Sequence, residues 1–227
     1  MIQVVKDVLF PPTCILCRGK LKQSHSIICL TCELNLPLSF RQHGVQPIER
    51  ALWGRVRLEW ASALYAFSKG SSTQELLHFL KYNSQPETVH AFGQKMGKAI
   101  ASRTELKKPD VIVPVPLHRK KRKQRGYNQA EELADGVAAV LKCKHRPFLL
   151  SREDHAASLT QLGRTDRWQR ISRAYQLKEE VEGIDHALLI DDVLTTGATI
   201  EVCANLLHEA GVSRVSVATL AFADKLL

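Results

Sequence analysis

Two adjacent carboxylates stand directly before a loop that is rich in threonine. An apolar run ends at Ile190, Asp191 and Asp192 follow it, and Thr195-Thr-Gly-Ala-Thr199 then opens a helical pattern. Backbone N–H groups and the helix dipole at such a helix start favour a bound phosphate. The carboxylates have the wrong charge for phosphate, but they suit sugar hydroxyls or Mg²⁺. The segment therefore predicts a site for a ligand such as a 5-phosphorylated ribose.

Two alternatives to this ligand site are weaker. The segment is not a Walker A loop, because the GxxxxGK pattern and its lysine are absent. An ordinary strand, turn and helix with a threonine N-cap would account for the apolar run and the loop. It would not account for Asp191 and Asp192, because carboxylates at a buried strand end are costly to desolvate.

Four of the six cysteines form two CxxC pairs, Cys14 with Cys17 and Cys29 with Cys32, with 11 residues between the pairs. Each pair can direct two thiolates at one centre, and two pairs complete a tetrahedron around Zn²⁺. Two disulfides are the alternative, but the N-terminus has no pattern of a secretion signal, so we expect a reducing, cytoplasmic compartment. We predict a structural zinc site, because four protein ligands leave no position open for catalysis.

The net charge of +9 is concentrated in two short segments. The first holds six cations and no acid within residues 118–125: Arg119, Lys120, Lys121, Arg122, Lys123 and Arg125. Three more cations lie within residues 142–146. A charge run is usually a solvated surface, but six cations in eight residues repel one another and favour an anionic partner.

Strand and helix patterns alternate along the rest of the chain and must position these residues. Strand patterns lie at residues 60–67, 110–116, 147–150, 186–190 and 215–222, and helical patterns at 72–80, 88–102, 128–141 and 198–210. Alternation of this kind predicts an α/β fold with a doubly wound, mainly parallel sheet. We expect two domains, a Cys₄ zinc-binding module at 1–45 and the sheet domain at 46–227. No apolar run approaches the 20 or so residues that cross a bilayer, so we expect no membrane insertion.

Residues 189–199 resemble the phosphoribosyl-pyrophosphate (PRPP) motif of type I phosphoribosyltransferases. Together with the CxxC pairs, Val113-Pro-Val-Pro-Leu117 and Arg125-Gly-Tyr-Asn-Gln129, they make the chain similar to the ComF family over residues 8–224. The resemblance implies a type I phosphoribosyltransferase-like fold with a small N-terminal zinc-ribbon-like module. It also implies a cytoplasmic role in natural transformation, in which incoming single-stranded DNA is handled before recombination.

The resemblance also assigns roles within a PRPP site. The two aspartates would bind the ribose hydroxyls, the threonine loop the 5-phosphate, and the turn at residues 113–117 the pyrophosphate with its Mg²⁺. A mobile loop at residues 119–128 would close over the ligand. The expected catalytic residues are Asp191, Asp192 and Arg125. The expected PRPP-binding residues are Val115, Pro116, Leu117, Arg119, Tyr127, Asn128, Asp191, Asp192, Val193, Leu194, Thr195, Thr196, Gly197, Ala198 and Thr199.

The chain departs from the family pattern at residues 165–173, so no role is carried over to Arg164, Arg167 or Arg170. The resemblance further hints that Lys81, at the end of a predicted helix, borders the active site.

Two hypotheses about function stay open. In the first, the protein binds PRPP with Mg²⁺ and transfers its phosphoribosyl group to an acceptor with release of pyrophosphate. In the second, it is a non-catalytic competence factor whose basic segment 118–128 binds single-stranded DNA, with PRPP as a regulator. Tyr127 and His118 beside the basic run would then stack on bases. Other competence or recombination proteins are further expected partners, and the sequence does not identify the acceptor.

Overall fold

A five-stranded parallel sheet forms the centre of the protein in the computed structural model, which describes residues 12–21, 26–39, 46–153 and 174–223. The strands, in their order across the sheet, are β1 (Ala61–Phe67), β7 (Arg214–Ala223), β6 (His186–Leu194), β2 (Val111–Pro114) and β3 (Lys144–His145). All neighbouring pairs in this sheet are parallel. A separate antiparallel pair is formed by β4 (Leu150–Arg152) and β5 (Tyr175–Leu177). The predicted α/β class with a mainly parallel sheet is confirmed.

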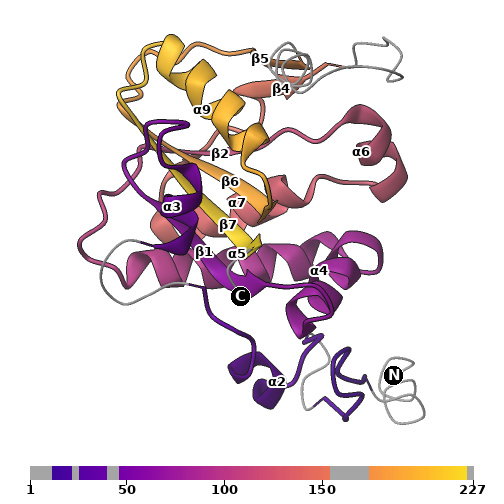
Figure 1. The fold of residues 1–227 in the computed structure, drawn as a ribbon. Helices are drawn as coiled ribbons and strands as arrows, with labels where there is room; N and C mark the ends of the chain where they lie inside the picture. Colours follow the sequence, from indigo (N-terminus) through magenta and orange to yellow (C-terminus); the bar gives the residue numbers. More distant parts are fainter. Residues whose placement is uncertain (1–11, 22–25, 40–45, 154–173, 224–227) are drawn as a thin grey trace.

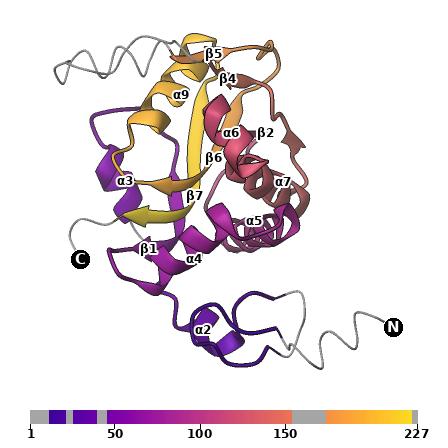
Figure 2. The same cartoon turned by 90° about the vertical axis from the view of Figure 1, so that its right-hand side faces the viewer.

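Helices cover both faces of the sheet (Figures 1 and 2). The helices of one layer are α4 (Ser72–Tyr82), α5 (Pro86–Ala101) and α7 (Gln129–Leu141), and those of the other are α3 (Pro47–Leu52) and α9 (Ala198–Glu209). Side chains of β6 alternate between the layers, as the period of a strand requires. Leu188 and Ile190 pack with α4, α5 and α7, whereas Ala187 and Leu189 pack with α3 and α9. The sheet is therefore doubly wound, as predicted.

Glycines let the backbones of α5 and α7 touch. A Cβ atom built on Gly136 would lie 2.3 Å from the carbonyl oxygen of His90, and one on Gly93 would lie 2.3 Å from that of Leu133. No side chain tolerates a distance that short. This contact fixes where α7 begins, and the residues that precede α7 belong to the candidate site.

The basic run differs from the expected mobile loop, because Arg119–Arg125 form helix α6. Lysine, arginine and glutamine are good helix formers, and Gly126, with φ of 84°, ends the helix in the left-handed conformation. Residues 119–124 are exposed, so water screens their like charges.

Two strand boundaries also differ from the prediction. Strand β6 continues past Ile190, because Asp191 and Leu194 still pair with β7, at Thr219 and Phe222. The short strand expected at residues 147–150 begins at Leu150 instead. The first difference matters for the site, because it places both aspartates within the strand.

The cysteine-rich N-terminal module packs against the α4–α5 layer. It contains the short helix α2 (Leu30–Leu34), and its buried Ile15 and Ile28 belong to the same apolar cluster as Leu76 of α4. Residues 37–39 then run antiparallel to β1, where the Ser39 N–H donates to Leu64 O at 3.0 Å. The division into domains at residue 45 stays a prediction, and the two parts share one apolar cluster. None of the described helices is long and apolar enough to cross a bilayer.

We predict that Gly136→Ala destabilises the protein by about 1–3 kcal/mol or more, because the added methyl group would overlap the α5 backbone. At an exposed helix position the same change would stabilise the protein by about 1 kcal/mol. A loss of stability would therefore show that Gly136 is in contact with the α5 backbone. Urea unfolding measures it. Ala139→Gly on the exposed face of α7 serves as the control, and should cost only the propensity difference. A stabilised Gly136→Ala protein would contradict the close packing of α5 on α7.

Candidate functional site

A cavity of about 100 Å³ lies at the carboxyl ends of β2 and β6, where ligands bind in open α/β sheets. Seven of the predicted PRPP-binding residues line it: Val115, Pro116, Leu117, Asn128, Asp191, Asp192 and Thr199. The cavity is also lined by four residues that are not in the predicted binding set: Gln129, Ala130, Arg152 and Tyr175. The structure thus brings the turn after β2, the start of α7 and the end of β6 to one place.

The two aspartates of β6 have different surroundings. The Lys81 ammonium, at the end of α4, is 2.9 Å from Asp192 Oδ2, so Asp192 is paired with a cation. Burial, reinforced by the neighbouring Asp192 carboxylate, raises the pKa of Asp191 well above its usual range. The Asp192 N–H donates to Asp191 Oδ1 at 2.8 Å and orients that carboxyl group. The hint that Lys81 borders the site agrees with this geometry.

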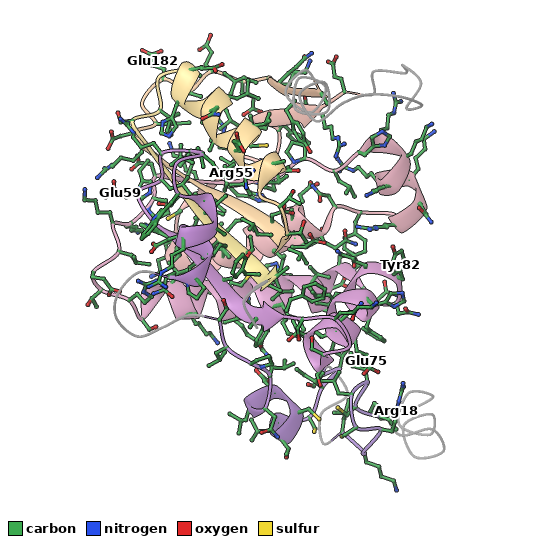
Figure 3. All side chains as sticks on the ribbon, viewed as in Figure 1. Arg18, Arg55, Glu59, Glu75, Tyr82 and Glu182 are labelled. Atoms are coloured by element: carbon green, nitrogen blue, oxygen red, sulfur yellow. The ribbon has the colours of Figure 1, made fainter. Side chains whose placement is uncertain are left out.

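The threonine loop is fixed from outside by a residue that the sequence did not indicate. Arg55 donates through Nη1 to the carbonyl oxygen of Thr196. Its Nη2 and Nε atoms lie 2.7 and 3.1 Å from Glu201 Oε2, in the first turn of α9. Figure 3 shows Arg55 between α3 and α9. No local pattern marks Arg55, because its partners are far away in the sequence.

Gly197 is the N-cap of α9 and has φ of 76°, a conformation that favours glycine. A Cβ at this position would lie 2.7 Å from Leu52 Cδ2. The loop therefore packs on α3 without a side chain between them. Because the first N–H groups of a helix have no partner within the helix, the start of α9 can donate to an anion.

The turn after β2 is connected to the start of α7 by one side chain. Asn128 donates through Nδ2 to Val115 O at 3.2 Å, and its Oδ1 accepts from the Ala130 N–H at 3.2 Å. Asn128 is buried and is the N-cap of α7. It therefore holds the two cavity walls together, and its ligand-binding role stays a prediction.

Three residues with predicted roles, Arg119, Arg125 and Tyr127, lie outside the cavity lining. Arg125 donates to Gln129 Oε1 at 2.9 Å, and its guanidinium is 5.3 Å from the centre of the Tyr82 ring. The Tyr127 hydroxyl donates to Leu80 O at 3.1 Å, so this ring joins the segment to α4. The catalytic role of Arg125 and the binding roles of Arg119 and Tyr127 stay predictions. Arg164, Arg167 and Arg170 lie outside the described residues.

The remaining members of the predicted set surround the loop. Val193 and Leu194 pack in the two apolar clusters on either side of the sheet, so their side chains serve the core. Thr195 and Thr196 lie in the segment that joins β6 to α9, and Ala198 is the first residue of α9, so the backbone groups of all three are the relevant atoms. Their binding roles also stay predictions.

The four predicted metal ligands come together in the N-terminal module. The Sγ atoms of Cys14, Cys17, Cys29 and Cys32 all lie within 4.8 Å of one another. The Cys17 and Cys29 sulfurs are 3.7 Å apart, too far for a disulfide and close to the roughly 3.8 Å edge of a tetrahedron with Zn–S bonds of about 2.3 Å. This donor set and spacing fit a tetrahedral, thiolate-bound metal ion.

Comparisons with known proteins agree with this geometry. The family model "Phosphoribosyl transferase domain" matches residues 85–226. The DNA utilization protein YhgH of Salmonella typhimurium strain LT2 is 29% identical over 91% of this chain and 95% of its own length. The competence protein ComFC of Bacillus subtilis strain 168 is 28% identical over 87% of this chain and 78% of its own length, and the resemblance to the ComF family is confirmed.

Among solved structures, the chain is similar to glutamine PRPP amidotransferase from B. subtilis, in complex with ADP and GMP. The identity is 19%, the TM-score is 0.43, and the alignment covers 63% of this chain but only 30% of that enzyme. The family match spans residues 85–226, which is more than half of the chain, and includes β2, β6 and α9. The chain therefore belongs to the family of phosphoribosyl transferase domains.

Proposed function

We propose that this protein binds PRPP together with Mg²⁺ in the cavity at the ends of β2 and β6. The observation that carries the proposal is the joint presence in one cavity of two carboxylates and the first turn of a helix. Carboxylates accept hydrogen bonds from sugar hydroxyls, and the helix start donates to phosphate. PRPP carries both kinds of group on one ribose, with hydroxyls on the ring and a phosphate at the 5 position.

Each wall of the cavity then has a separate task. Asp191 and Asp192 bind the ribose hydroxyls, the N–H groups of Thr195–Thr199 bind the 5-phosphate, and the turn at Val115–Leu117 faces the pyrophosphate. Mg²⁺, when bound, neutralises charge that develops on the leaving pyrophosphate. In a transferase, an acceptor would form a bond to the ribose anomeric carbon as the bond to pyrophosphate breaks. The acceptor is not specified by the residues that line the cavity.

The cellular role that we propose is in natural transformation, where DNA enters the cell as a single strand. The names of similar proteins support it, because they include a competence protein and a DNA utilization protein. A cytoplasmic location suits the chain, since none of its six cysteines is in a disulfide.

Helix α6 supports DNA binding as a second candidate function. Its six cations lie on one short helix without an acidic residue, and Lys120, Lys121 and Lys123 are exposed. An extended polyanion can contact such a surface without entering the cavity. The two functions are compatible, because α6 and the cavity are separate.

For the N-terminal module we propose a structural Zn²⁺ held by Cys14, Cys17, Cys29 and Cys32. Only 11 residues separate the two cysteine pairs, so the metal would supply much of the stability of this loop. We propose no catalytic role for this zinc, because four thiolate ligands leave no position on the metal open for water or substrate.

We predict that PRPP binds in a Mg²⁺-dependent manner and that Asp192→Asn weakens its affinity about ten- to a hundredfold, since hydrogen bonds to a charged group are lost. Isothermal titration calorimetry measures the affinity. Asp185→Asn, at the amino end of β6, is the matched control and should bind normally. Binding that is indifferent to both Mg²⁺ and Asp192→Asn would refute the proposed site.

We predict that Lys120, Lys121 and Lys123 changed together to glutamine weaken binding to single-stranded DNA. Three lost phosphate contacts should reduce the slope of log affinity against log salt by about 2. Fluorescence anisotropy of a labelled oligonucleotide at several salt concentrations gives this slope. Lys98, Lys142 and Lys144 changed to glutamine remove the same charge elsewhere, and equal effects of the two triple variants would argue against α6 as the DNA-binding surface.

We predict about one zinc per chain by elemental analysis, and its loss in Cys14→Ser. Cys143→Ser is the control, because this thiol lies outside the cluster and donates to Pro109 O, which a serine hydroxyl can also do. If the wild-type protein is folded, free of metal and oxidised at the four cysteines, the zinc proposal is wrong.

A further inference from the structure

Arg152, at the end of β4, is a cation without an acceptor inside the candidate site. Its side chain lines the cavity next to Thr199 and Asp191. Its Nε atom is buried and has no hydrogen-bond partner, and within the described residues its guanidinium forms no ion pair. A buried donor that lacks an acceptor lowers stability by roughly 1–3 kcal/mol, so the fold does not gain from this arrangement.

The position of Arg152 is set by packing. Its guanidinium lies 5.2 Å from the centre of the Tyr175 ring, on the paired strand β5, in a cation–π contact. Tyr175 is 3% exposed. Burial raises the pKa of Tyr175 to about 12. Tyr175 and Thr199, in the first turn of α9, line the same cavity as Arg152.

The cavity contains a second donor of the same kind. Gln129 is 3% exposed, its Oε1 accepts from Arg125, and its Nε2 is buried without a partner. The acidic groups of the cavity do not compensate Arg152, because Asp192 is paired with Lys81 and Asp191 has a raised pKa. A ligand that satisfies both donors must carry several acceptor atoms and negative charge.

We propose that Arg152, supported on the Tyr175 ring, binds a phosphate group of the ligand, and that Gln129 donates a second hydrogen bond to the same ligand. The proposal rests on the proposed function, since it assigns two residues to the PRPP site. A guanidinium suits the task, because its planar fork binds two phosphate oxygens at once. PRPP has a 5-phosphate and a pyrophosphate group, and the experiment shows which of the two Arg152 binds.

The test measures affinity for ribose 5-phosphate, for pyrophosphate with Mg²⁺, and for PRPP with Mg²⁺ by calorimetry. Arg152→Met keeps the aliphatic stem on the Tyr175 ring and removes the charge. We expect about a ten- to hundredfold loss of affinity for PRPP and for one of the two fragments. The fragment that is affected identifies the phosphate group that Arg152 binds. Arg152→Lys should recover part of the affinity, because it keeps the charge without the fork.

A second measurement separates binding from a structural role. Without ligand, the melting temperature of Arg152→Met should equal or exceed that of the wild type, because an unsatisfied donor is removed. Lys178→Met is the matched control. It removes a cation that directly follows β5 and whose Nζ atom lies 2.8 Å from Glu153 Oε1. It should leave all three affinities unchanged.

The outcomes are distinct. Wild-type protein that binds PRPP, with Arg152→Met equal to it for all three ligands, would overturn the role of Arg152 and leave the proposed function intact. A lower melting temperature in Arg152→Met, with no recovery of affinity in Arg152→Lys, would assign the residue to the fold and would also overturn the proposal. Wild-type protein that binds none of the three would reject the proposed function itself.

Discussion

Negative charge at the end of a buried strand is the constraint on which the site depends. Asp191 and Asp192 are consecutive residues of β6, and their carboxylates cannot both be ionised there without compensation. Lys81 compensates Asp192 at 2.9 Å, and burial raises the pKa of Asp191. Carboxyl oxygens accept hydrogen bonds from hydroxyls, whereas an ionised carboxylate offers no donor to a phosphate. The anionic groups of a ligand must therefore lie elsewhere, and the first turn of α9 and Arg152 are the groups that would receive them.

Two of the cations around the site come from outside the region that matches the phosphoribosyl transferase family. Residues 85–226 contain β2, β6 and the loop, whereas Arg55 and Lys81 precede them. Arg55 fixes the carbonyl of Thr196, and Leu52 packs where Gly197 has no side chain. Helix α4, which carries Lys81, also contacts the cysteine module, where Arg18 lies 3.6 Å from Glu75 (Figure 3). A continuous set of contacts thus connects the cysteine module to the carboxylates.

The distribution of positive charge separates two surfaces. The six cations of α6 dominate the net charge, yet they lie outside the cavity lining, and Arg122 and Arg125 are engaged by Glu131 and Gln129. The cations that support the cavity are Lys81, Arg55 and Arg152. These cations belong to no dense basic run, and their role follows from their contacts in the folded protein. Net charge therefore describes the outer surface of the protein and says little about the site.

The sequence by itself determined the longer strands of the central sheet, the loop after Asp192 and the two CxxC pairs, because each depends on residues that are close along the chain. Apolar runs, a helix start and a pair of thiols are recognisable without knowledge of their neighbours in space. Only the tertiary structure decided that Arg55 meets Glu201, 146 positions away, and that Arg152 rests on Tyr175. These contacts depend on which faces of the sheet the helices cover and on how closely α5 and α7 pack, and no local pattern encodes either.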